Sequence, residues 1–103
     1  MPLHASYIDV EDRLDLSFSG NLDVTLSEAV WDICKQVPTN LVTCVVDLSE
    51  VERLFDSGLA LLQMLFRRLN DLGVIVVFLS DCPEIRERIS VVTQRGRCPI
   101  EAQ

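Results

Sequence analysis

A serine hydroxyl at the start of a predicted helix is the group in this sequence best placed for chemistry. A long stretch with helical leucine spacing opens with Phe55-Asp56-Ser57-Gly58-Leu59. A helix N-terminus presents unpaired amide groups and the positive end of the helix dipole, so it would accommodate a phosphate on Ser57. Asp56 or Ser57 could instead act only as the N-cap of the helix, because both residue types are common caps.

Two apolar segments that flank this helix are predicted to be neighbouring parallel strands. Residues 41–47 and 74–79 are rich in valine, which is typical of strands covered on both faces. Between them, residues 57–72 show leucines at helical spacing, and Gly73 would end that helix. Such a unit crosses over right-handedly and places its site at the carboxyl edge of the sheet. We therefore expect residues 48–57 and 80–82 to form loops at that edge.

The N-terminal part is predicted to be a hairpin followed by a helix. Apolar and polar residues alternate over 14–18, as in a half-buried strand, and Ile8 and Val10 continue this pattern before a turn at Glu11-Asp12. Residues 26–37 have helical spacing, and Thr25 and Glu28 are spaced as a capping box.

The C-terminal part is predicted to contain one more helix, over residues 81–92, on which Arg86 and Arg88 are expected to face solvent. Residues 93–103 would be a short edge strand or a disordered tail. Together these elements predict a single α/β domain over residues 1–103. Its mixed sheet would have about four strands, an N-terminal hairpin plus parallel strands, with helices packed on it.

Composition restricts the partners of the protein. The net charge is −7, which disfavours nucleic acid and anionic membrane surfaces, and the excess of acids lies in residues 1–50. The apolar strand at 74–79 is too short to cross a bilayer. A partner that contacts the N-terminal half would therefore present a basic protein surface.

The cysteines and the single histidine do not predict a metal or cofactor site. Cys34, Cys44, Cys82 and Cys98 lack Cys-x-x-Cys spacing, and His4 stands near the chain end. Unpatterned cysteines without a secretory signal suggest the reducing cytoplasm. We therefore expect no metal and no cofactor.

Three short motifs, taken in their order and spacing, resemble the STAS family, the sulfate transporter and anti-sigma factor antagonist domain. They are Gly20-Asn21-Leu22-Asp23, Asp47-Leu48-Ser49 and Ser57-Gly58-Leu59, and the resemblance covers about residues 5–92. Bacterial antagonists of this family are phosphorylated on the second hydroxyl of a loop with Asp, two hydroxyl residues and Gly. The kinase is the partner protein that also serves as the anti-sigma factor.

The resemblance implies roles for particular residues of this chain. Ser57 falls on the phosphoacceptor position and Gly58 on the glycine, whereas Asp56 replaces the first hydroxyl and Phe55 replaces the aspartate. Asp23 matches an acidic position near the same edge. The expected partner-binding residues are Asp23, Arg53, Phe55, Asp56, Gly58 and Leu59.

Two other classes of function remain open from the sequence. The replacement of the family's aspartate by Phe55 and of its first hydroxyl by Asp56 favours another member of the family. This would be a STAS subunit that docks, without phosphorylation, on the ATPase of a lipid or solute ABC transporter. An enzyme is disfavoured, because there is no Gly-x-Ser-x-Gly elbow, no Gly-rich phosphate loop and no base spaced to activate Ser57. Trp31 flanks the apolar stripe of the first helix, and its exposure would indicate an interface. The sequence does not determine the oligomeric state.

Overall fold

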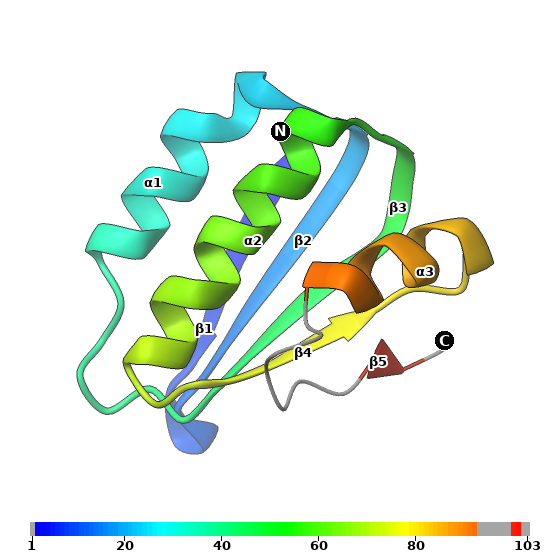
Figure 1. Cartoon of the computed structure of the whole chain (residues 1–103). Coiled ribbons are helices and arrows are strands. Elements are labelled where there is room, and N and C mark those ends of the chain that lie inside the picture. Colours follow the sequence, from blue (N-terminus) through cyan, green and yellow to red (C-terminus); the bar gives the residue numbers. More distant parts are fainter. Residues whose placement is uncertain (1, 93–99, 102–103) are drawn as a thin grey trace.

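One mixed β-sheet carries the helices of this chain on a single face. The computed structural model describes residues 2–92 and 100–101. Its five strands follow sequence order across the sheet; β1 and β2 are antiparallel, and the other neighbours are parallel (Figure 1). In chain order the elements are β1 (Leu3–Ile8), η1 (Asp9–Glu11), β2 (Arg13–Leu22), η2 (Val24–Leu26), α1 (Ser27–Lys35), β3 (Thr43–Leu54), α2 (Asp56–Asp71), β4 (Ile75–Leu79), α3 (Pro83–Val92) and β5 (Ile100–Glu101). The predicted α/β class and mixed sheet are confirmed.

The hairpin turn works without glycine because Asp12 adopts the left-handed conformation, with φ of 48°. Aspartate tolerates this region better than most residues, since its short side chain hydrogen-bonds locally. The Asp12 carbonyl also accepts a bond of 2.9 Å from the amide of Val42, which ties the turn to the chain before β3. Val10 was expected to extend the strand, but it lies in the 3-10 turn η1 and is 94% exposed.

The core lies between the sheet and the helices. Alternate residues of β2, β3 and β4 point to the helical face, and the buried side of α2 packs on them. The rings of Phe66 on α2 and Phe78 on β4 lie 6.4 Å apart between centroids. Fully buried large side chains are Leu16, Phe18, Leu22, Val30, Cys44, Val46, Leu48, Leu62, Leu65, Leu69, Phe78 and Ile89.

The predicted strand, helix, strand unit is present. β3 and β4 pair in parallel register from Thr43 opposite Ile75 to Asp47 opposite Leu79, with α2 as the crossover. β3 is longer than expected, because residues 50–54 continue to pair with residues 19–22 of β2. The predicted loop over residues 48–57 is therefore wrong, and only Phe55 lies between β3 and α2.

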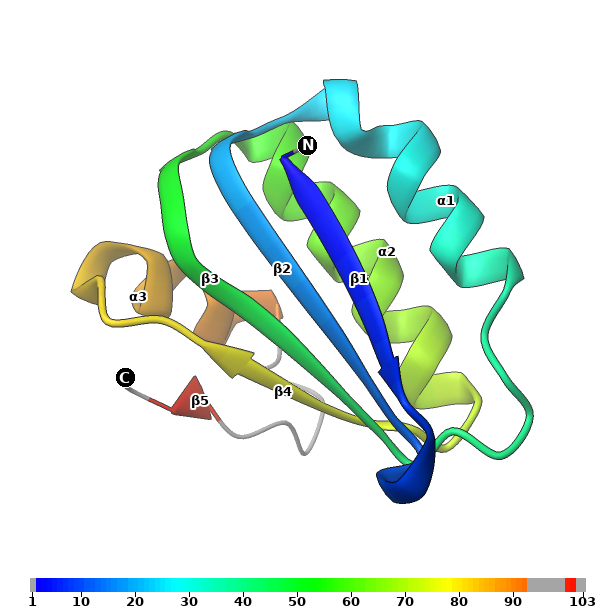
Figure 2. The same ribbon diagram turned by 180° about the vertical axis from the view of Figure 1, so that it is seen from behind.

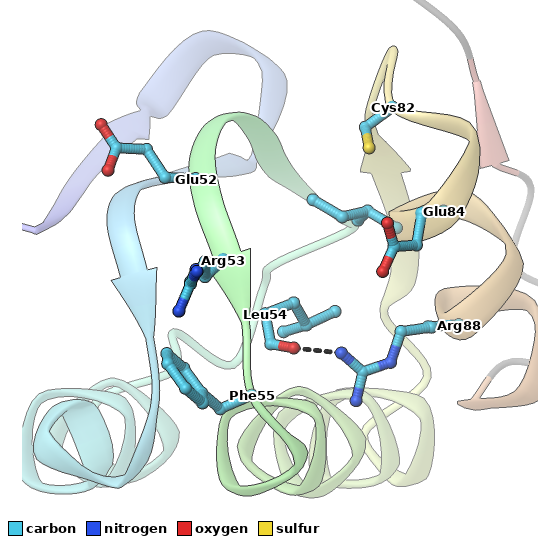
Figure 3. A pocket seen from close by; sticks show the side chains of 8 residues that line it. Glu52, Arg53, Leu54, Phe55, Cys82, Glu84 and Arg88 are labelled. Carbon is cyan, nitrogen blue, oxygen red and sulfur yellow. Dashed lines mark hydrogen bonds between the residues drawn. The ribbon is translucent and has the colours of Figure 1, made fainter.

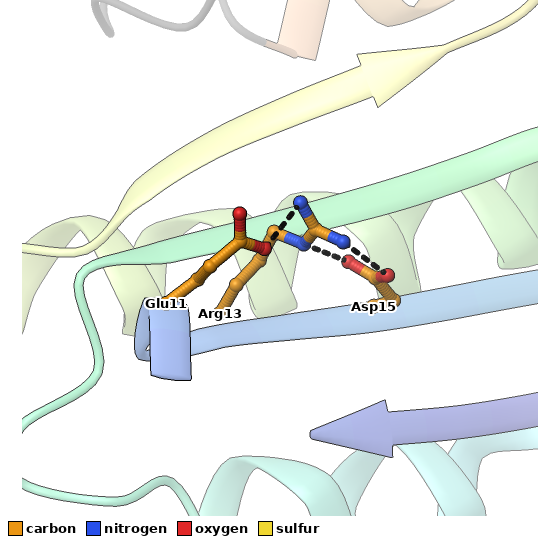
Figure 4. A network of polar contacts seen from close by, with 3 residues as sticks. All are labelled: Glu11, Arg13 and Asp15. Atoms are coloured by element: carbon orange, nitrogen blue, oxygen red, sulfur yellow. Dashed lines mark hydrogen bonds and ion pairs between the residues drawn. The ribbon is translucent and has the colours of Figure 1, made fainter. Parts of the chain in front are cut away.

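No helix among residues 2–92 covers the second face of the sheet, which is called the open face, so the prediction of strands covered on both faces is wrong for this part of the chain (Figure 2). The strand order advances in one direction from β2 to β4, and two right-handed crossovers then place α1 and α2 on the same side. On the open face, Arg13 forms ion pairs of 2.9 Å with both Glu11 and Asp15 (Figure 4). Ile75 is 54% exposed there.

Candidate functional site

The N-terminus of α2 is joined to the end of β2, more than thirty residues earlier in the chain. The amide of Phe55 donates to the carbonyl of Leu22 at 3.1 Å, and the amide of Val24 donates to Oγ of Ser57 at 3.0 Å. These two bonds bring the β2–α1 connection beside the first turn of α2. The sequence motifs around Asp23 and Ser57 therefore lie at one edge of the molecule, as predicted.

Gly58 makes this approach possible because it lacks a side chain. A Cβ atom at this position would overlap the carbonyl oxygen of Leu22 and lie 2.5 Å from its carbonyl carbon. Gly58 is buried, so it is a spacing residue under the site and offers little surface to a partner.

Ser57 is partly exposed at this edge. The N-cap of α2 is Phe55, which has no side-chain cap bond, so neither Asp56 nor Ser57 is the cap. The hydroxyl instead accepts the hydrogen bond from Val24 described above. A helix start without a side-chain cap keeps unpaired amide groups, which favour negative charge at Ser57.

Asp23 has the capping role that the sequence suggested for Thr25 and Glu28. It precedes η2, and its Oδ1 accepts hydrogen bonds from the amide of Thr25, at 3.0 Å, and from the Thr25 hydroxyl. These hydrogen bonds lower the pKa of Asp23 below its ordinary value. The carboxylate is therefore charged at neutral pH, next to the segment that contacts Ser57.

Arg88 joins α3 to the same edge, although the sequence placed it on a solvated helix face. Its guanidinium donates to the carbonyl of Leu54 (Figure 3). Another nitrogen of the same group lies 2.6 Å from Oδ1 of Asp56. The side chain of Asp56 is fully exposed, whereas that of Arg88 is 28% exposed. The solvated role predicted for Arg88 is wrong, because the end of β3 and the start of α2 offer it two oxygen acceptors.

A hollow of about 370 Å³ opens beside this edge, between the end of β3 and α3 (Figure 3). Its wall carries both signs of charge together with apolar groups: Glu52, Arg53, Leu54, Phe55, Cys82, Glu84, Ile85 and Arg88. Phe55 is 40% exposed, which is high for an aromatic side chain. Half-exposed aromatic and arginine side chains are typical of protein-binding surfaces.

The structure brings most of the predicted site residues to one surface. Arg53 and Phe55 line the hollow, Asp56 contacts Arg88, and Ser57 contacts Val24. Leu59 is partly buried against the core, so it supports this surface more than it forms it. The sequence analysis did not place Arg88 at this surface. The feature that could have indicated it is a basic residue on α3, the helix that follows β4, because β4 is the neighbour of β3 in the sheet.

Neither a metal centre nor a membrane span is found in the part of the chain that the structure describes. Within residues 2–92 and 100–101, no three side chains of His, Cys, Asp or Glu gather in a way that could hold a metal ion. No helix among these residues has the length and apolar character needed to cross a bilayer.

Solved structures similar to this chain include anti-sigma factor antagonists. SpoIIAA in its unphosphorylated form is 17% identical, with a TM-score of 0.71 over 98% of this chain and 89% of that one. Its phosphorylated form, described as a Bacillus cell fate determinant, is 13% identical, with a TM-score of 0.70 over 98% and 90%. An antagonist from Mycobacterium paratuberculosis is 22% identical, with a TM-score of 0.69 over 95% and 84%. The chain therefore has the STAS fold of these antagonists, as the sequence motifs predicted.

A region of a larger protein called Mglu is also similar, at 31% identity and a TM-score of 0.64. That match covers 79% of this chain but only 19% of Mglu. No family model matches the sequence, and no curated protein matches it.

Proposed function

We propose that this protein is a regulatory binding module that contacts a protein partner through the surface around Ser57. We call this surface the α2 edge, and it consists of Asp23, Arg53, Phe55, Asp56 and Ser57. The observation that carries the proposal is the hydrogen bond from Val24 to Ser57, which presents a partly exposed hydroxyl where two chain segments meet. The STAS fold shared with anti-sigma factor antagonists supports a function of this type.

The proposed switch is phosphorylation of Ser57 by the partner kinase, which also serves as the anti-sigma factor. A phosphate would add a charge of about −1.5 to −2 at pH 7. It would stand beside the carboxylate of Asp56, which is fully exposed and forms an ion pair with Arg88. The added charge and bulk would break a contact that the unmodified hydroxyl allows. The similar protein SpoIIAA has been solved in both phosphorylated and unphosphorylated forms, which supports the proposed switch.

A second candidate is a STAS subunit that docks on the ATPase of an ABC transporter without being phosphorylated. The observation that favours it is Asp56, whose fully exposed carboxylate already places a negative charge next to Ser57. Such a charge opposes the approach of another phosphate. It also provides a permanent contact for a basic partner surface.

The first experiment compares Ser57→Ala and Ser57→Asp in affinity capture from the native host, with mass spectrometry of the captured proteins. We expect Ser57→Ala to capture its partner as well as the unphosphorylated wild-type protein does. Ser57→Asp is expected to capture about tenfold less or worse, because one misplaced charge at an interface costs more than about 1.4 kcal/mol.

Thr39→Asp is the matched control, since it turns an exposed hydroxyl residue into an acid in the loop between α1 and β3. That loop lies at the opposite end of α2 from Ser57 (Figure 1), so partner capture should not change. Equal capture by Ser57→Ala and Ser57→Asp would contradict the proposed role of Ser57. Phosphate on Ser57 and a captured kinase support the first candidate, whereas an unmodified Ser57 and a captured ATPase support the second.

A further inference from the structure

A second hollow lies between α1 and α2, away from the α2 edge. It has a volume of about 330 Å³ and is lined by Trp31, Cys34, Lys35, Met64 and Arg68. The two helices run side by side along the sheet (Figure 1). Met64 follows Ser57 by about two helical turns, so this hollow is separate from the surface proposed for the protein partner. We call it the α1–α2 pocket.

The floor and one wall of the α1–α2 pocket are apolar. Cys34 is buried, and Met64 packs against the hydrophobic core. Burial raises the pKa of the Cys34 thiol, while the charge of Arg68 opposes this effect. The thiol therefore stays uncharged at neutral pH. Trp31 lines the pocket and is 52% exposed. From the sequence, exposure of this residue was expected to indicate an interface.

Two cations stand at the rim of this apolar pocket. Nζ of Lys35 lies 6.0 Å from the centroid of the Trp31 ring and 4.0 Å from the Asp32 carboxylate, so its charge is only weakly paired. Arg68 is exposed, and within residues 2–92 and 100–101 its guanidinium forms no ion pair. Arg68 without an ion pair and Lys35 with only a weak one leave a local excess of positive charge on a protein whose net charge is −7.

We propose that the α1–α2 pocket binds a small amphiphilic anion that has an apolar body and a single carboxylate-like headgroup. The apolar body would lie on Met64 and against the Trp31 ring, and the headgroup would lie between Lys35 and Arg68. The volume is at the lower end of the range for small-molecule sites. The overall negative charge of the protein repels anions in general, so attraction at this point requires the local pair of cations.

The test uses decanoate as the probe and the fluorescence of Trp31 as the readout. Trp31 is the single tryptophan of the sequence, so all tryptophan emission comes from a residue that lines this pocket. We expect a saturable change with a Kd of about 0.1–1 mM, as is usual for a ligand of this size with moderate efficiency. Decanol and decyltrimethylammonium have the same chain without the negative headgroup, and we expect each to bind at least about fivefold more weakly.

Arg68→Gln removes one of the two rim cations and should weaken decanoate binding by about fivefold. Arg67→Gln is the matched control, because Arg67 is an exposed neighbour on α2 that does not line the pocket. This variant loses the same charge and should bind decanoate as tightly as the wild-type protein does. Three results would overturn the proposal: no saturable response, equal binding of the cationic probe, or equal weakening by both substitutions. None of these measurements depends on Ser57, so their failure would leave the α2 edge untouched.

Discussion

Gly58→Ala is expected to prevent folding, or to lower the free energy of unfolding by more than about 4 kcal/mol. The added Cβ would overlap the backbone carbonyl of Leu22, and a backbone atom cannot rotate away as a side chain can. The first turn of α2 would then have to move off β2. That movement would break the hydrogen bonds from Phe55 to Leu22 and from Val24 to Ser57.

Urea unfolding followed by circular dichroism measures this effect, with Gly73→Ala as the matched control. Gly73 has a φ of +79°, and a Cβ there would meet no atom within 4 Å. Its replacement should cost only the strain of a left-handed alanine, about 1–2 kcal/mol. A Gly58→Ala protein as stable as the Gly73→Ala protein would show that β2 and α2 do not approach as closely as described.

Phe78→Ala is expected to cost about 3–5 kcal/mol of unfolding free energy. The Phe78 side chain is fully buried on β4, and its ring packs beside that of Phe66 on α2. Removing it would leave a cavity in the middle of the core. This is a large fraction of the ~5–15 kcal/mol that stabilises a typical domain, so urea or thermal unfolding should show it directly.

Phe55→Ala is the contrasting variant for this measurement. Phe55 is 40% exposed at the α2 edge, so its truncation should change stability by less than about 1 kcal/mol. Its cost should appear in partner capture instead, because exposed aromatic side chains often anchor an interface. If Phe55→Ala destabilised the protein as much as Phe78→Ala, Phe55 would be a core residue and not part of a binding surface.

The sequence predicted the parts of the fold that depend on periodic burial. Alternation in β2 and the leucine spacing of α2 both arise from one apolar face that packs on the core. Valine-rich β3 and β4 were predicted to be covered on both faces. Valines in a strand do not show whether helices cover one face of the sheet or both. Val45 and Val77, for example, lie on the open face and are only half-buried.

The extension of β3 could not be predicted, since Ser49, Glu50 and Glu52 show no apolar pattern. Residues 50–54 are strand because β2 pairs with them, and pairing between distant segments leaves little trace in one sequence. For the candidate site, the sequence predicted the position of two residues: Ser57 and the segment of Asp23 lie at one edge, as expected. The contacts of Arg88 were missed, because they depend on where α3 packs.

The most direct test of the α2 edge as the partner surface is photo-crosslinking in the native host. A crosslinking amino acid is placed at Phe55 in one variant and at Val10, in the turn between β1 and β2, in another. Both positions are exposed, and the turn lies at the other end of the sheet (Figures 1 and 2). We predict a specific covalent adduct with another protein from Phe55 and none from Val10. Equal adducts from both positions, or an adduct from Val10 alone, would contradict the account.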